Sequence, residues 1–261
     1  MRRLTLAVAI LVCVVFPGHA YAQFSGPIFF PPSPQEDYGP GVTVSGIGFA
    51  PLGARDRTTG RAMGDARRRA EAIASTLGVS LGDVRHVEVS TPFEPRPDCG
   101  ERRTRRCARL DAVTVEATFA IVGGPGDSEG ARELEGSGVG TAASEPARKT
   151  SPAIRHALRV ARLAATPTAA QAARANAQAA ATASGVPLGQ LSSVVEPANF
   201  YGYEPLLGAF GPGQFCGTFR RFIVVRDPET GERRAVRRKR VRRCYSPRST
   251  AVRLQVTYLG G

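Results

Sequence analysis

The chain contains one segment twice, and this repetition constrains its fold more than any other feature. The Ala-rich segment Ala66–Gly82 recurs 107 residues later as Ala173–Gly189. Both copies end in the pattern Gly-Val-x-Leu-Gly, at Gly78 and at Gly185, with one constant offset. A repeated segment of this length indicates a duplicated structural unit, so the fold must accommodate two copies of one arrangement.

The first copy is predicted to be a helix from about Thr59 to Leu77. Its apolar residues recur at the spacing of one helix face, and most of them are alanine, which predicts close packing on a partner surface. They are Ala62, Ala66, Ala70, Ile73, Ala74 and Leu77. Gly78 then ends the helix, because glycine adopts a left-handed conformation at low cost.

Strands are predicted on both sides of this helix. Val42–Ala50 precedes it, Val84–Phe93 follows it, and Asp111–Val122 alternates apolar and polar residues with period two. The second copy repeats the pattern, since Ser137–Gly140 echoes Ser45–Gly48 at an offset of 92. Each unit is therefore expected to contain a strand, a helix and two further strands.

The second unit is predicted to contain further elements. A strand is expected near Gln190–Glu196, and Thr250–Tyr258 matches Asp111–Phe119 at an offset of 139. An additional helix is expected over Ser151–Ala165, with Ser151 as N-cap and Pro152 at its first position. Pro167 is expected to separate this helix from the second Ala-rich helix.

These patterns predict an α+β fold. It consists of a duplicated strand-helix-strand-strand unit, with antiparallel sheet or sheets covered on one face by the Ala-rich helices. We expect repeat 1 over residues 42–123, a linker over 124–134 and repeat 2 over 135–261.

The amino terminus is typical of a signal peptide over residues 1–22. Arg2 and Arg3 precede the apolar run Leu4–Phe16, and Ala20–Tyr21–Ala22 forms an A-x-A cleavage site. The run is shorter than the roughly 20 apolar residues that span a bilayer, and no later stretch approaches that length. We expect an exported protein, periplasmic or extracellular and cell-wall associated, with a Pro/Gly-rich leader over 23–41 and no transmembrane segment after signal removal.

The repeated segments resemble the SIMPL-domain family of exported bacterial proteins. The resemblance rests on Val42, Val44 and Gly46, on the Ala-rich helix and on Leu77–Val84, and it covers most of residues 42–122 and 135–259. It implies an α+β domain of the cell envelope. Some members are oligomeric and some are linked to stress defence, and no catalytic residues are established. The Cys-bearing, Arg-rich inserts and the extra helix depart from this pattern.

Four cysteines remain after signal removal, and in an exported chain an even count predicts disulfides. Cys216 and Cys244 lie symmetrically about the turn Asp227–Glu232, which predicts a hairpin with strands over Phe219–Val225 and Arg234–Val241. The duplication favours this pair together with Cys99–Cys107, and pairing across the repeats is the alternative.

Positive charge is concentrated beside these cysteines. The formal net charge is +13, and Arg220–Arg248 alone contains twelve Lys or Arg against three acids. A hairpin of this charge density attracts anionic polymers or acidic protein faces. The candidate anion-binding residues are Arg233, Arg234, Arg237, Arg238, Lys239, Arg240, Arg242 and Arg243. The alternative is an oligomeric scaffold of the envelope, in which these charges only keep the sheet edges soluble.

No pattern in the sequence indicates catalysis. His86 and His156 lie in different predicted elements, no nucleophile motif is present, and the acids of the basic inserts are expected to form salt pairs. The spacing of Cys, His and acidic residues offers no metal site, and no cofactor is expected. Ser45–Gly48 lacks the Lys and the spacing of a phosphate loop. Behind a signal peptide, nucleic acid is not an expected partner.

Overall fold

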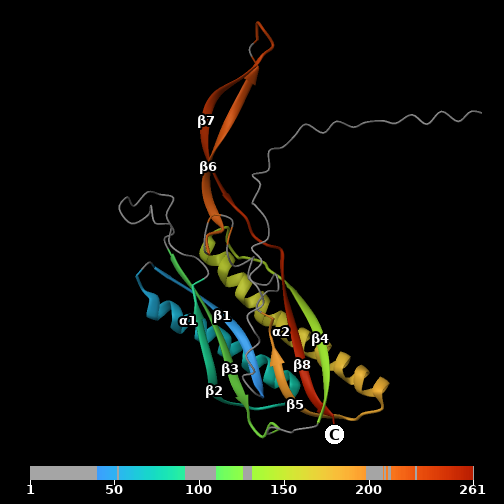
Figure 1. Ribbon diagram of the computed structural model, residues 1–261. Helices are drawn as coiled ribbons and strands as arrows, with labels where there is room; N and C mark the ends of the chain where they lie inside the picture. The colour runs from blue at the N-terminus through green and yellow to red at the C-terminus, as the bar shows by residue number, and fades with distance from the viewer. Residues whose placement is uncertain are drawn as a thin grey trace, which may run out of the picture. The chain divides into compact units, whose positions relative to one another are not determined.

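The two repeats lie side by side in one six-stranded sheet (Figure 1). Repeat 1 supplies β1 (Gly41–Pro51), α1 (Arg55–Leu77), β2 (Leu81–Ser90) and β3 (Leu110–Ile121). Repeat 2 supplies β4 (Arg132–Ala143), α2 (Ser151–Ser184), β5 (Leu188–Val195) and β8 (Ser249–Gly260). Between β5 and β8, the strands β6 (Cys216–Arg226) and β7 (Arg233–Cys244) form a separate two-stranded sheet.

The computed structural model describes residues 40–51, 53–91, 110–125, 131–197, 208, 210, 213–226 and 228–260. At residues 111, 219–226 and 233–239 it describes the backbone alone. All described residues belong to one unit, Gln35–Gly261. The predicted signal peptide, nearly all of the leader, and Cys99 and Cys107 lie outside the described residues.

The strand order shows how the repeats are joined. It is β2-β3-β1-β5-β8-β4, so the order within repeat 1 recurs in repeat 2. Pairing within each repeat is antiparallel, as predicted, whereas β1 pairs in parallel with β5 through Gly41–Thr43 and Ser193–Val195. This parallel pair departs from the predicted antiparallel sheet. Within repeat 1, β1 and β2 are both antiparallel to β3 and therefore run in the same direction. The counterpart of β2 in repeat 2 is β5, and the two repeats have the same orientation in the sheet, so β5 runs parallel to β1.

The strand glycines allow the helices to lie directly on the sheet. A Cβ at Gly46 would collide with the backbone of Ala62 and Ala66 on α1. A Cβ at Gly138 would collide with Ala169 and Ala173 on α2, which are the counterparts of those two residues. The predicted alanine stripe is buried, and Gly78 adopts the left-handed conformation with φ of 77°. The α+β fold of duplicated units is thus confirmed.

Helix α2 differs from the prediction because it is one continuous helix of 34 residues. The prediction that Pro167 separates two helices was wrong. Ala165 and Ala169 are fully buried on either side of Pro167, so packing on the sheet holds the helix together where proline removes one hydrogen bond. The N-cap is Thr150, whose Oγ1 accepts from the Ala153 N–H at 3.4 Å, and Ser151 is already helical.

Within the described part of the chain, neither helix is both long and apolar enough to cross a membrane.

Candidate functional site

The β6–β7 hairpin is joined at its base by a disulfide between Cys216 and Cys244, which confirms that predicted pair. The two cysteines face each other in the strand register, and Arg226 faces Arg233 at the other end. The predicted hairpin strands are therefore confirmed and are somewhat longer than expected. Pairing of Cys99 with Cys107 stays a prediction, because both lie outside the described residues.

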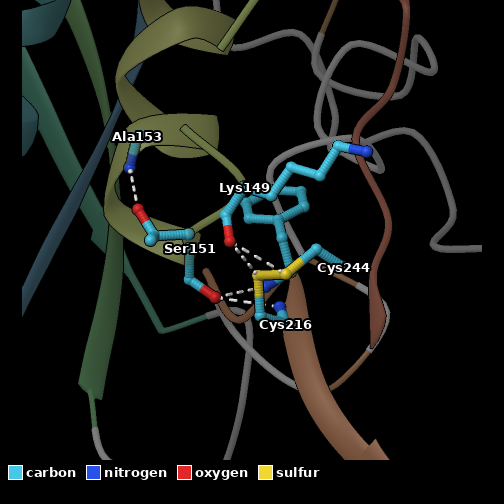
Figure 2. The surroundings of a disulfide bond; sticks show 7 residues. Lys149, Ser151, Ala153, Cys216 and Cys244 are labelled. Atoms are coloured by element: carbon cyan, nitrogen blue, oxygen red, sulfur yellow. Dashed lines mark hydrogen bonds between the residues drawn. A yellow bond between two sulfur atoms is a disulfide. The ribbon is translucent and has the colours of Figure 1, made fainter. Parts of the chain in front are cut away.

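The start of α2 holds the base of the hairpin (Figure 2). Ser151 Oγ accepts hydrogen bonds from the backbone N–H groups of Phe215 and Cys216, each at 2.9 Å. The Lys149 carbonyl oxygen lies 3.2 Å from Sγ of Cys244. Ser151, predicted as a helix cap, therefore acts instead as an anchor for the first residues of β6.

A small apolar cluster lies beneath this anchor. Phe215 is buried with Ile154 and Leu158 of α2 and with Ile47 and Phe49 of β1. The Tyr245 N–H donates to the Phe215 carbonyl oxygen at 2.9 Å, so both ends of the hairpin are fixed to the same residue of the cluster. The hairpin base is therefore attached to the core, although β6 and β7 form their own sheet.

The candidate anion-binding residues all lie on β7. The hairpin register places Arg220 opposite Arg240 and Arg221 opposite Lys239. Arg240, Arg242 and Arg243 are exposed. For the remaining candidates the structure gives backbone positions only, and these residues are Arg233, Arg234, Arg237, Arg238 and Lys239.

A cavity of about 330 Å³ lies beside the hairpin base. Its lining includes Cys244 together with the cationic residues Lys149 and Arg248 and the acidic residue Glu145. Positive charge thus continues from β7 onto the body of the protein, and Glu145 offsets part of it.

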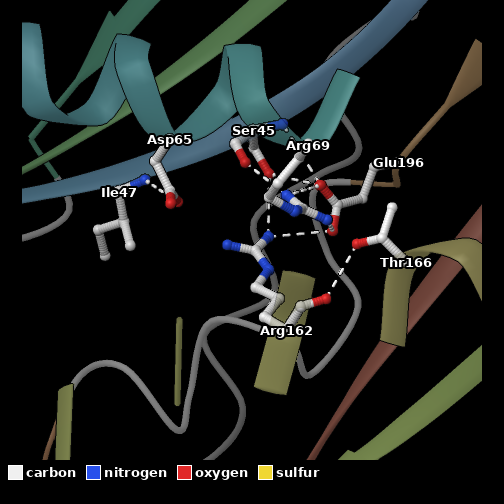
Figure 3. Close-up of polar contacts among 7 residues, drawn as sticks. All are labelled: Ser45, Ile47, Asp65, Arg69, Arg162, Thr166 and Glu196. Atoms are coloured by element: carbon white, nitrogen blue, oxygen red, sulfur yellow. Dashed lines mark hydrogen bonds and ion pairs between the residues drawn. The ribbon is translucent and has the colours of Figure 1, made fainter. Parts of the chain in front are cut away.

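A second polar cluster, which no sequence pattern indicated, is buried where the repeats meet (Figure 3). Arg69 of α1 and Arg162 of α2 both bind Glu196, which follows β5. The distance from Arg162 Nη2 to Glu196 Oε1 is 3.0 Å. Burial alone would raise the pKa of Glu196, but the two guanidinium groups outweigh it and hold that pKa at about 2.

This cluster completes the hydrogen bonding of β1 beyond its short pairing with β5. Glu196 accepts from the Ser45 N–H at 3.3 Å, and Asp65 accepts from the Ile47 N–H at 3.4 Å. Arg69 donates to the Ser45 carbonyl oxygen, and Arg61 donates to the Phe49 carbonyl oxygen at 2.7 Å. Because buried backbone groups need partners, the cluster is explained by the fold without any ligand.

No repeat pattern could have revealed this cluster. The counterpart of Arg69 is Asn176 and that of Glu196 is Val89, so neither partner of this ion pair is repeated in the other copy. A sequence signal was available only as a difference between the two copies, and such a difference does not by itself show that the residues meet.

Comparison with known proteins identifies one related family. Residues 39–122 match the family model described as SIMPL, protein of unknown function (DUF541). Neither the curated proteins nor the solved structures give a match. The resemblance inferred from the repeated segments is therefore confirmed for repeat 1.

Proposed function

We propose that this chain, whose residues 39–122 match the model of the SIMPL family of unknown function, is an exported, non-catalytic envelope protein that binds anionic polymers through its β6–β7 hairpin. The observation that carries this proposal is the register of the hairpin. It sets cation against cation at two successive positions, Arg220 with Arg240 and Arg221 with Lys239.

This arrangement is unfavourable for the isolated hairpin. Like charges directly across two strands cost roughly 0.2–1 kcal/mol per pair. The segment Cys216–Cys244 contains eleven Lys or Arg against three acids, so most of its charge has no neutralising group within the hairpin. The disulfide offsets the repulsion, since closing a loop of this length contributes about 3.6 kcal/mol in the chain-entropy model. A polyanion laid along the hairpin would relieve the repulsion as well.

The proposal is tested by binding of a fluorescent polyphosphate over a series of salt concentrations. The variant R240E/R242E/R243E should bind about 100-fold more weakly than the natural chain, since each surface cation contributes roughly 1 kcal/mol near an anionic surface. Binding of the natural chain should weaken as salt rises. Poly-glutamate serves as a second probe, and preference for it would indicate an acidic protein face as the partner.

The matched control reverses three exposed arginines of α1, in the variant R55E/R57E/R67E. It changes the net charge by the same amount and leaves the hairpin intact, so it should retain most of the binding. Equal losses in the two variants would show that net charge alone is responsible, and the hairpin would lose its assigned role.

Export is part of the proposal, supported by the composition of residues 1–22. Cell fractionation tests it, because the mature chain should be found outside the cytoplasm with about 22 residues removed. A full-length chain in the cytosol would contradict it.

The second candidate function is an oligomeric scaffold of the envelope in which the arginines only prevent edge-to-edge aggregation of the hairpin. The observation that favours it is the pair of outer strands, β2 and β4, each of which pairs with one neighbour among the described strands. A large assembly whose size does not respond to salt, in a chain that fails to bind polyphosphate, would select this function.

A further inference from the structure

We infer that copies of this chain associate head to tail, with β4 of one copy pairing in parallel with β2 of the next. The contact would repeat between molecules the junction that β1 and β5 form within one molecule. This inference does not depend on the hairpin, so its test is independent of the test of polyanion binding.

The two outer strands are the counterparts of the two strands that meet at the internal junction. At that junction Gly41–Thr43 of β1 pairs with Ser193–Val195 of β5. The repeat offsets map these segments onto Glu133–Glu135 of β4 and His86–Glu88 of β2. The outer edges of the sheet therefore carry both halves of a contact that the chain already makes once.

The backbones of the counterpart strands have the same irregularities. Pairing of β2 with β3 shifts register between Leu81 and Val84 and again between Val84 and His86. Pairing of β5 with β8 shifts between Leu188 and Leu191 and again before Ser193, at the equivalent positions. Since β5 offers a usable edge after these shifts, the edge of β2 after His86 is available in the same form.

Side chains that the internal junction buries are exposed on β2. Leu191 and Val194 of β5 are 6% and 0% exposed, whereas their counterparts Val84 and Val87 are 38% and 45% exposed. A second copy seated on β2 would cover this apolar surface as repeat 1 covers that of β5.

The outer strand β4 also exposes an apolar side chain. Val139 is 49% exposed, whereas its counterpart Ile47 is buried by Phe215 and by Ile154 and Leu158, which lie in the part of α2 that α1 lacks. Within the described chain, Asn176 is the one side chain hydrogen bonded to the outer edge of β4, through the Ser137 carbonyl oxygen at 2.6 Å. It stands in the position that Arg69 occupies against Ser45.

The other groups that cap β1 have no equivalent on α2. The counterparts of Asp65 and Arg61 are Ala172 and Thr168, which lack the carboxylate and guanidinium groups that bind the β1 backbone. The edge of β4 beyond Ser137 thus offers its backbone groups to another strand. An unprotected edge of this kind is a template for strand addition.

The outer junction would lack the buried ion pair of the inner one. Val89 replaces Glu196, and Asn176 replaces Arg69, so the buried ion pair is absent from the contact. Both replacements are uncharged, so neither leaves an unpaired charge at these two positions, and an unpaired buried charge is the costly case.

One charge pair opposes the contact. The mapped register places Glu135 of β4 beside Glu88 of β2, and Glu88 already lies opposite Glu116 on β3. Repulsion between these carboxylates would keep the association weak. Because the two contacting surfaces differ, each copy can bind another at both edges, which generates a ring or an open chain of molecules.

Sedimentation velocity of the mature chain over a hundredfold concentration range tests the inference. The sedimentation coefficient should rise with concentration, and V87K/V89K should require at least tenfold higher concentration for the same rise. E135Q should show the same rise at a lower concentration than the natural chain, because it removes the repulsion from Glu88. The control V160K changes a valine of α2 that is 54% exposed, and it should behave as the natural chain. A natural chain that stays monomeric throughout, or V87K/V89K that associates unchanged, would overturn the inference.

Cross-linking tests the register. Oxidation of a mixture of E135C and E88C chains should give a disulfide-linked heterodimer, whereas E135C alone should give little product. Efficient linkage of E135C to itself would indicate an antiparallel pair of β4 strands and would overturn the head-to-tail contact. The hairpin variant R240E/R242E/R243E should associate like the natural chain, which separates this result from the test of polyanion binding.

Discussion

Glu196 is the single residue on which both repeats and the extra length of α2 converge. It binds Arg69 from repeat 1 and Arg162 from repeat 2, and it accepts the Ser45 N–H of β1. One carboxylate therefore compensates two buried cations and completes the edge of a strand. Removal of its charge would leave both guanidinium groups in a site that excludes water.

The substitution Glu196→Gln should lower the free energy of unfolding by about 3–5 kcal/mol, the usual consequence of removing one partner of a buried ion pair. Urea unfolding followed by circular dichroism measures the change. The control Glu71→Gln removes an exposed carboxylate that pairs with Arg67 four residues earlier, and it should cost less than about 0.5 kcal/mol. A loss for Glu196→Gln as small as that of the control would contradict the assigned role of the cluster.

Acid should weaken the fold through the same residue. The pKa of Glu196 is lowered from 4.5 to about 2, so its contribution is complete above pH 4.5 and is lost as the pH falls toward 2. This shift corresponds to about 3 kcal/mol. Urea unfolding between pH 5 and pH 2.5 should show a steeper loss for the natural chain than for Glu196→Gln. Parallel slopes in the two proteins would contradict the prediction.

Glu116 should act in the opposite direction. Its burial, and secondarily the charge of Glu88, raise its pKa, so its protonated form is favoured in the folded chain and its contribution diminishes as the pH rises through that pKa. The charge of Glu196 is a further, smaller cause of this rise, so Glu196→Gln keeps most but not all of the Glu116 contribution.

At the level of elements, close contact between strand and helix depends on glycine. Gly46 of β1 faces the backbone of α1, and Gly138 of β4 faces that of α2 at the equivalent position. The alanine stripe of each helix completes the contact, because no larger side chain separates the helix from the sheet.

The substitution Gly46→Ala should therefore destabilise the protein by at least about 1–3 kcal/mol, the usual cost of overpacking a core. Gly60→Ala on α1 is the matched control. A Cβ there meets nothing within 4 Å, so alanine should stabilise the helix by about 0.5–1 kcal/mol. Thermal unfolding of both variants measures the difference. If Gly46→Ala were tolerated as well as Gly60→Ala, the helix would not lie as close to β1 as described.

Sequence patterns predicted most of these elements because their signals are local. Alternation gave β3 and β8, the alanine stripe gave α1, and symmetric cysteines gave the hairpin. The continuity of α2 could not be predicted in this way. Proline disfavours a helix locally, and only the buried alanines on both sides of Pro167 reverse that preference.

At the level of the whole molecule, duplication predicted two equal units but not the edge along which they join. That edge is set by Gly41–Thr43 and by Glu196, and the decisive side chains occupy positions at which the repeats differ. From the sequence alone these positions are only differences between the copies, and the structure is needed to show that Arg69 and Glu196 form an ion pair. The outer strands β2 and β4 are the counterparts of the two strands that meet at this edge, and the sedimentation and cross-linking experiments test whether they pair between molecules.

The unbroken course of α2 has a mechanical consequence. Its first residues grip the base of the hairpin through Ser151, its middle holds Glu196 through Arg162, and its last turns lie on the sheet of repeat 2. A force applied to the hairpin is therefore transmitted along the continuous helix α2 to the junction between the repeats. Tension applied at the tip would load the ion pair directly, and the sheet would yield there before its antiparallel halves are disturbed.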